Sequence, residues 1–165
     1  EVALTRFEEG SHDLAIRHGP GHWPGLTSHH LMDDALFPVA SPRLPGFAKV
    51  KTPADVARLP LINDLARQGW HDWLRAAGVH GAQLSPAHVF SDTTDAFEAA
   101  AHGLGAALAR EKIVEPWLLD GRLVRLPGPS LATRWNYFVV HPSHRRLRAG
   151  ARAFLDWLLE DARTH

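Results

Sequence analysis

Residues 87–110, AHVFSDTTDAFEAAAHGLGAALAR, constrain the fold of this chain more than any other stretch. Four residues of strand character, AHVF, run directly into SDTT, where Ser91 or Asp92 can cap the start of a helix. LGAALA then predicts a further strand after that helix. The helix itself carries an apolar stripe of three residues: Phe97, Ala101 and Leu104. A strand that leads into a capped helix and then into a second strand is the repeating unit of an α/β fold.

Similar signals recur along the rest of the chain. Further strands are expected at 2–7, 13–17, 59–64, 122–126 and 133–142, with extended chain over 27–44. Helices are expected at 52–59 with Thr52 as N-cap, at 68–78 with Trp70 and Trp73 on the core face, at 114–121 with Pro116 near the first turn, and at 142–163. This alternation predicts a mostly parallel sheet that is covered by helices on both faces, with ligands bound outside the carboxyl ends of the strands.

Composition excludes several classes of protein. The chain has 165 residues and no cysteine, which removes disulfides, thiolate metal sites and cysteine nucleophiles. Its 18 basic and 18 acidic residues balance, so the surface is not that of a protein that covers a phosphate backbone. There is no apolar run of membrane-spanning length, and the first residues show no basic segment followed by an apolar one. Because EVALTRF starts on an alternating apolar pattern without an initiator Met, we expect the sequence to be a fragment.

Twelve histidines raise the question of a metal site. His18 and His22 have the spacing of two zinc ligands on a helix, but the Gly-Pro-Gly run between them forbids that helix. His29 and His30 are adjacent, so on a strand they would point to opposite faces. We therefore expect no metal and no other cofactor.

Serine hydrolysis, dinucleotide binding and DNA contact by a basic cluster are three other possible functions, and the sequence lacks the surrounding pattern that each requires. No G-x-S-x-G elbow follows a strand, which argues against a serine hydrolase. The glycines of HGPGHWPG and HGLGAAL do not connect a strand to a helix as a dinucleotide-binding loop does, and they fit turns and helix ends better. The basic cluster HRRLR, residues 144–148, is expected to be a solvated face in the first turn of the last helix.

Two features remain that suit binding of a small anion or polar molecule. SDTT, residues 91–94, offers hydroxyls and backbone N–H groups at a helix N-terminus, although a plain N-cap is the better explanation of this stretch taken alone. Arg17 stands at the carboxyl end of the DLAIR strand, where a guanidinium can hold an anion, although a surface ion pair is the simpler interpretation.

The stretch DLAIRHGPGHWPGLTSHHLMDDALFPVASPRL resembles the effector-binding domain of LysR-type transcriptional regulators, in the branch that regulates glycine cleavage and β-lactamase. The resemblance continues in order through WHDWLRAAGV, FSDTTDAFEAAAHGLGAALAREKIVEPWLLDGRLVRL and YFVVHPSHRRLRAGARAFLDWLLEDA, and so covers nearly the whole chain. It implies an α/β domain of two Rossmann-like lobes of the type II periplasmic-binding-protein kind. Residues 1–39 and 141–165 would form lobe I, and residues 40–140 would form lobe II, with crossings at LFPVASP and WNYFVVHP.

The resemblance also implies where an effector binds. The family's cleft between the lobes is lined by positions that correspond to the turn Arg17-His18-Gly19 and to Tyr137, Thr93 and Thr94. Asp13 corresponds to a position close enough to influence switching, and no contact is assigned to it. The family's DNA-binding winged helix-turn-helix and the first strand and helix of lobe I are absent, so lobe I is expected to be incomplete.

We therefore expect a ligand-sensing and self-associating domain of a bacterial cytoplasmic regulator, and not an enzyme. Its partners would be a small-molecule effector, further copies of the chain in a dimer or tetramer, and DNA only through the absent N-terminal domain, without a membrane. A solute-binding protein of the same architecture is the alternative, and an α/β enzyme comes third because the two-lobed fold also hosts catalysis. A helix-turn-helix upstream would favour the regulator, and a signal peptide would favour the solute-binding protein.

Overall fold

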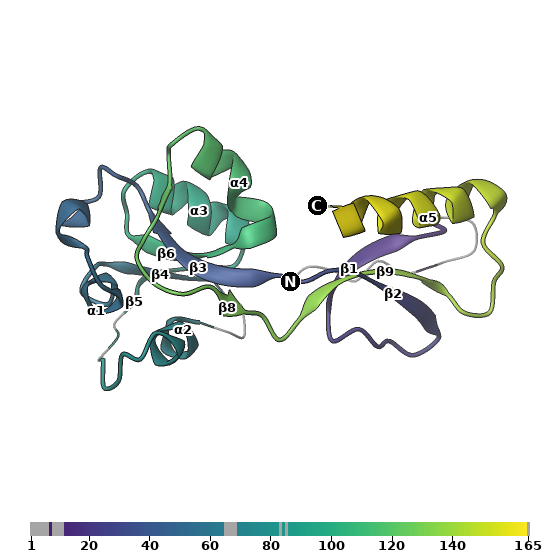
Figure 1. Ribbon diagram of the computed structural model, residues 1–165, viewed down its shortest axis with the longest axis horizontal. Coiled ribbons are helices and arrows are strands. Elements are labelled where there is room, and N and C mark those ends of the chain that lie inside the picture. Colours follow the sequence, from purple (N-terminus) through teal and green to yellow (C-terminus); the bar gives the residue numbers. More distant parts are fainter. Residues whose placement is uncertain (1–6, 8–11, 65–68, 83, 85, 165) are drawn as a thin grey trace. The chain divides into compact units, whose positions relative to one another are not determined.

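The computed structural model describes residue 7 and residues 12–64, 69–82, 84 and 86–164. The chain divides into two compact units (Figure 1), here called unit 1, which comprises Glu1–Asp34 and Thr133–His165, and unit 2, which comprises Ala35–Ala132. Unit 2 therefore begins and ends earlier in the chain than the expected lobe II, residues 40–140. The reason is that β3 (Ala35–Ala40) pairs entirely within unit 2, whereas β9 (Asn136–Pro142) pairs entirely within unit 1. The strand expected at 2–7 lies outside the described residues except for Phe7.

Unit 2 is built on a mixed sheet. Its strands are β3, β4 (Leu61–Asp64), β5 (Pro86–Phe90), β6 (Ala106–Arg110), β7 (Val124–Arg125) and β8 (Leu131–Ala132). They lie in the order β5-β4-β6-β3-β7, with β8 also beside β3. β4 pairs parallel with β5 and β6, but β3 pairs antiparallel with β6, β7 and β8. The expectation of a mostly parallel sheet is therefore correct only for β4, β5 and β6, because β3 enters unit 2 from unit 1 and runs against them.

Helices cover both faces of this sheet, as expected (Figure 1). α1 (Pro53–Val56) and α2 (Trp70–Ala76) pack on one face, and α3 (Thr93–Ala101) and α4 (Glu111–Leu119) pack on the other. The strands supply alternate residues to the two cores: Val39 and Ala107 face α3 and α4, whereas Ala40 and Ala106 face α1 and α2. A short 3₁₀ turn, Phe47–Lys49, precedes α1.

Local sequence signals account for most helix ends in unit 2. Asp92 caps α3 by accepting hydrogen bonds from the backbone N–H groups of Thr94 and Asp95. Thr52 and Asp55 form a capping box at α1, and Thr52 holds the pKa of the Asp55 carboxyl below its usual value by donating a hydrogen bond to it. α4 differs from expectation. It begins at Glu111, so Pro116 lies inside the helix and not near its first turn.

Unit 1 is a three-stranded sheet with one helix. β9 lies between β1 (Ala15–Gly19) and β2 (Leu26–Met32) and pairs antiparallel with both. α5 (Ala149–Thr164) packs on the sheet through Leu155, which is fully buried with Leu31 and Val139. The DLAIR segment is thus not the buried parallel strand that the sequence suggested, because its described neighbour is β9, and Ile16 is 58% exposed.

The basic cluster also lies elsewhere than expected. Residues 144–148 precede α5 instead of forming its first turn, and the guanidinium of Arg148 forms an ion pair with Asp13. The helix starts later because Pro142 ends β9 and the chain turns there, with the N–H of Arg145 donating to the carbonyl of Pro142. The cluster is therefore part of a turn that ties the end of β9 to the residues before β1.

Two histidines form a hydrogen-bonded pair beneath α5. Nε2 of His29 in β2 lies 3.3 Å from Nε2 of His141 in β9, and the two rings are stacked. Because Nδ1 of His141 lies 3.2 Å from the carbonyl oxygen of Pro142, it carries the proton of the neutral ring. His29 is therefore the donor of the shared bond.

We expect acid to destabilise unit 1 through this pair. Burial holds the pKa of His29 below its usual 6.5, and the positive charges of His141 and Arg152 lower it further, against an opposing effect of Asp156. The unfolded chain then takes up a proton more readily than the folded one, so the free energy of unfolding falls as the pH drops below about 6.5. The effect is measured by urea unfolding of the chain at several pH values across this range. Hydrogen exchange of the α5 amides reports the stability of unit 1. His29→Gln should flatten the dependence, whereas the exposed His144→Gln should leave it unchanged; equal slopes in both variants would refute this role.

Candidate functional site

The residues of unit 1 expected at the site lie together on two paired strands. Arg17, His18 and Gly19 end β1, and His18 pairs directly with Tyr137 of β9. The two rings lie 4.9 Å apart between centroids, and Nε2 of His18 lies 3.0 Å from the carbonyl oxygen of Trp135. Because each of these contacts immobilises the imidazole, His18 is held in one orientation at the end of the strand.

The indole of Trp23 completes this group. A Cβ atom built on Gly19 would lie 2.7 Å from Cζ2 of Trp23, so only glycine admits the ring there. The guanidinium carbon of Arg17 lies 5.5 Å from the centroid of the same ring, within the range of a cation–π contact. The AIRHG segment therefore packs against the Trp-Pro loop that follows it. Gly19 leaves room for the ring of Trp23, and this ring contacts Arg17.

Unit 2 contains a cavity of about 270 Å³ beside the parallel strands β4 and β6, and it reaches the carboxyl end of β4. Leu61, Ile62, Ala107 and Leu108 supply its apolar wall, together with Leu36 of β3 and Ala96 of α3. Four polar residues also line it: Asn63, Asp64, His71 and Asp72. This place in the fold is the one that α/β proteins commonly use for ligands, and the volume is close to the lower limit for a small-molecule pocket.

The expected site residues Thr93 and Thr94 stand at the start of α3, and Thr93 is tied to the cavity. The hydroxyl of Thr93 donates to Oδ2 of Asp64 at 2.9 Å, so the start of α3 is joined to the end of β4. The backbone N–H of Thr94 donates to Asp92 at 2.7 Å. The helix N-terminus predicted from the sequence is therefore present, and two of its N–H groups, those of Thr94 and Asp95, donate to the carboxylate of Asp92.

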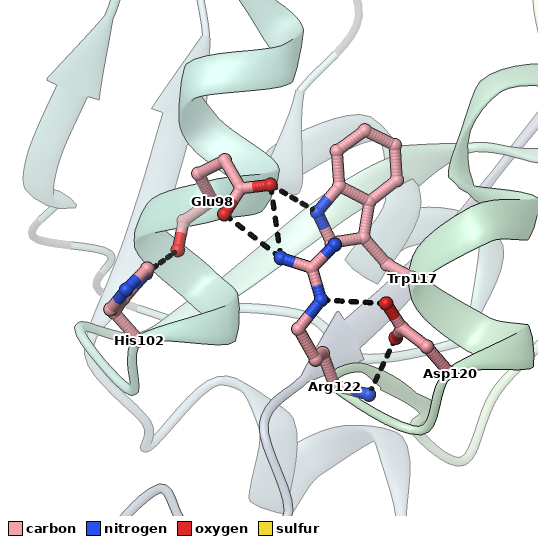
Figure 2. Close-up of polar contacts among 5 residues, drawn as sticks. All are labelled: Glu98, His102, Trp117, Asp120 and Arg122. Atoms are coloured by element: carbon pink, nitrogen blue, oxygen red, sulfur yellow. Dashed lines mark hydrogen bonds and ion pairs between the residues drawn. The ribbon is translucent and has the colours of Figure 1, made fainter.

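A second polar cluster holds the opposite end of α3 (Figure 2). Glu98 accepts hydrogen bonds from Nε1 of Trp117 at 2.8 Å and from Arg122, which also pairs with Asp120. The Trp117 indole, followed by Arg122, lowers the pKa of the Glu98 carboxyl. In the same figure, Nδ1 of His102 lies 2.8 Å from the carbonyl oxygen of Glu98. The cluster ties α3 to α4 and so fixes the helix whose first turn carries Thr93.

The question of a metal site that the histidines raised can be tested in the part of the chain that the structure describes. There, no group of three or more histidine, aspartate and glutamate side chains is arranged to hold an ion. Over the same residues, no helix combines the length and apolar character needed to cross a bilayer.

Sequence reasoning missed the residues that surround the expected contacts. Asn63 and Asp64 are the last two residues of a predicted strand, and that position alone was the available signal for them. Trp135 and Trp23 approach His18 and Gly19 only through strand pairing and loop packing, for which the sequence carries no signal. The arrangement brings Arg17, His18, Gly19 and Tyr137 together in unit 1, and Thr93 and Asp64 together in unit 2.

Comparisons with known proteins identify this architecture. The family model described as "LysR substrate binding domain" matches residues 2–163. The glycine cleavage system transcriptional activator of Escherichia coli (strain K12) is 36% identical over 153 residues, which are 91% of this chain and 50% of that protein. The transcriptional activator AmpR of Citrobacter freundii is 31% identical over 149 residues, which are 88% of this chain and 50% of that protein. The chain thus spans about half the length of these relatives, which are named as regulators and not as enzymes.

Solved structures agree with the sequence matches. The effector domain of the transcriptional regulator AmpR of Pseudomonas aeruginosa superposes with a TM-score of 0.80 at 28% identity, covering 92% of this chain and 73% of that chain. The AmpR effector-binding domain of Citrobacter freundii gives 0.75 at 28% identity, covering 93% and 76%. The two-lobed α/β fold class expected from the sequence is thereby confirmed. The order of the motifs, the mixed α/β architecture and the family match together show that this chain belongs to the family of LysR substrate-binding domains.

Proposed function

We propose that this chain is the ligand-sensing and self-associating domain of a bacterial, cytoplasmic LysR-type transcription regulator, and that it has no catalytic activity. The match to regulators over nearly the whole chain carries the proposal, and it favours this function over solute capture for transport. DNA binding would belong to a domain outside this sequence, in agreement with the equal numbers of acidic and basic residues here.

In this proposal a small effector contacts Arg17, His18, Gly19 and Tyr137 of unit 1 and Thr93 and Thr94 of unit 2. A ligand that contacts both units favours the orientation in which all of its contacts are made, and its differential affinity supplies the free energy of the switch. Self-association of the chain, as a dimer or tetramer, would carry the change to the DNA-binding domains. The cation–π contact of Arg17 with Trp23 and the hydrogen bond of Thr93 to Asp64 support the proposal, since both hold contact residues in place before ligand arrives.

Titration calorimetry of single variants tests the contacts. The effector is first selected by thermal shift from amino acids, peptidoglycan fragments and aromatic acids. We expect Arg17→Ala and Thr93→Ala each to weaken its binding about tenfold or more, because each removes a polar contact in a partly desolvated site.

Arg163→Ala and Thr164→Ala are the matched controls, since both residues lie in the last turn of α5, where Arg163 pairs with Glu160 and donates to the carbonyl of Leu159. Their affinity should equal that of the parent chain. Unchanged affinity in both Arg17→Ala and Thr93→Ala would show that the effector does not use these positions.

A further inference from the structure

Helix α5 of unit 1 carries apolar side chains on two of its flanks. Leu155 faces the sheet and is fully buried, whereas Phe154 and Trp157 are 51% and 57% exposed. The two exposed rings lie 5.6 Å apart between centroids, so they form one aromatic surface. Because large aromatic side chains gain free energy on burial, two neighbouring ones left in water indicate a surface that another element covers.

The sheet face on which α5 packs is also incompletely covered. Ile16 of β1 pairs directly with Val139 of β9, so the two side chains point to the same face of the sheet. Val139 is buried together with Leu155 of α5, but Ile16 is 58% exposed. At this level of the sheet, α5 therefore covers β9 and leaves the side chain of β1 largely in solvent.

The two exposed rings of α5 lie on the side of the helix where β1 runs. Arg152 lowers and Asp156 raises the pKa of His29 in β2 through their charges, so these two residues lie on the flank of α5 beside β2. At about 100° per residue, the two aromatic residues lie on the nearly opposite flank. β1 lies across β9 from β2, so the aromatic rings and Ile16 border the same uncovered part of unit 1.

We propose that this apolar face, formed by Ile16, Phe154 and Trp157, is the docking surface for a helix of the same protein that precedes Glu1 in the chain. The solved AmpR effector domains contain residues without a counterpart here, because this chain covers 73% and 76% of them. In unit 2 two helices pack on each face of the sheet, whereas α5 alone packs on this face among the described residues of unit 1.

A helix fits this surface better than a second copy of the chain. The three apolar side chains span about the width of one helix, and a helix beside α5 would complete the layer at an axis separation of about 8–10 Å. A stable interface between two protein copies buries about 800 Å² on each, which is far more than three side chains expose. The inference rests on the proposed function only because it requires the longer regulator, and it uses none of the effector contacts.

Hydroxyl-radical footprinting tests whether this face is covered in the longer protein. The 165-residue chain is compared with a chain that is extended upstream from Glu1 by the residues that its own gene encodes. We expect oxidation of Phe154 and Trp157 to be severalfold slower in the extended chain, because the added helix excludes solvent from both rings. Leu119 at the end of α4, which is 81% exposed, is the control, and its oxidation rate should be equal in the two chains.

Trp157→Ala gives an independent readout in the same two chains. In the 165-residue chain the substitution should leave the midpoint of urea unfolding nearly unchanged, because the ring is already exposed. In the extended chain we expect the midpoint for unit 1 to fall by about 1 M, because the substitution then removes a buried aromatic side chain. Leu119→Ala should shift the midpoint in neither chain, since that side chain stays exposed in both.

Several results would overturn the inference. Equal oxidation of Trp157 in the two chains would do so, as would equally small midpoint shifts of Trp157→Ala in both. Protection of Trp157 in the extended chain that is lost on dilution would assign the face to a second copy instead. A gene in which Glu1 directly follows the initiator Met would leave no upstream helix to dock. Unchanged effector affinity in Arg17→Ala and Thr93→Ala would refute the proposed effector contacts, and the docking surface would still stand.

Discussion

Trp73→Ala is expected to lower the free energy of unfolding of unit 2 by about 3–5 kcal/mol, the usual cost of deleting a large aromatic side chain from a core. Trp73 is fully buried, and its Nε1 donates to the carbonyl of Pro129 at 2.9 Å. A Cβ atom on Gly128 would lie 2.3 Å from its ring, so the ring fills the space that this glycine leaves. The substitution thus opens a cavity and leaves the Pro129 carbonyl without its indole donor, and both effects destabilise.

Urea unfolding followed by circular dichroism measures this loss. Trp157→Ala is the matched control, because that tryptophan lies on α5 with 57% of its surface exposed, and its removal should change stability by less than about 1 kcal/mol. Equal losses in the two variants would mean that Trp73 does not have the packing described for it. Since the substitutions lie in different units, hydrogen exchange can assign each loss to its own unit.

Gly105→Ala is expected to destabilise unit 2 by about 1–3 kcal/mol through a backbone clash. A Cβ atom at this position would lie 2.5 Å from the carbonyl oxygen of Pro60 and 3.2 Å from Cγ1 of Ile62. That carbonyl accepts the N–H of Ala106 at 2.8 Å, so the two strands cannot separate without losing a hydrogen bond. The glycine is therefore required by close approach of β6 to the start of β4.

Gly150→Ala provides the comparison for Gly105→Ala. Gly150 lies in the first turn of α5, and a methyl group at this position would have no described atom outside the helix backbone within 4 Å. Alanine there should stabilise the helix by up to about 1 kcal/mol. The midpoint of urea unfolding should thus fall for Gly105→Ala and rise for Gly150→Ala. A Gly105→Ala protein as stable as its parent would show that β4 and β6 adjust without cost.

Local signals in the sequence were sufficient for α2 and α3. The α2 helix has buried Trp70, Trp73 and Leu74 on the expected face, and Gly78 ends it with a φ of +75°. These predictions succeed because caps and apolar periodicity act over four or five residues. They failed for residues 144–148, where the turn and the ion pair of Arg148 with Asp13, a residue 135 positions away, replace the expected first turn of a helix.

The residues of the proposed site could be selected from the sequence, but their hydrogen-bond partners could not. The order of motifs identified the family, and with it Arg17, Thr93 and Tyr137 as expected contact positions. The hydrogen bond from Thr93 to Asp64 depends on the parallel pairing of β4 and β5 and on the start of α3 beside them, so no local pattern reveals it.

By itself, the sequence determined the strand and helix alternation, the caps and the family of this protein, because those depend on neighbouring residues and on the order of motifs. Only the tertiary structure decided which strands run antiparallel, which glycines make room for Trp23 and Trp73, and which donors around Thr93 are already used. The physical reason is that hydrogen-bond partners and close packing are set by residues far apart in the chain. Whether a helix N-terminus can receive an anion depends on those partners as much as on its own sequence.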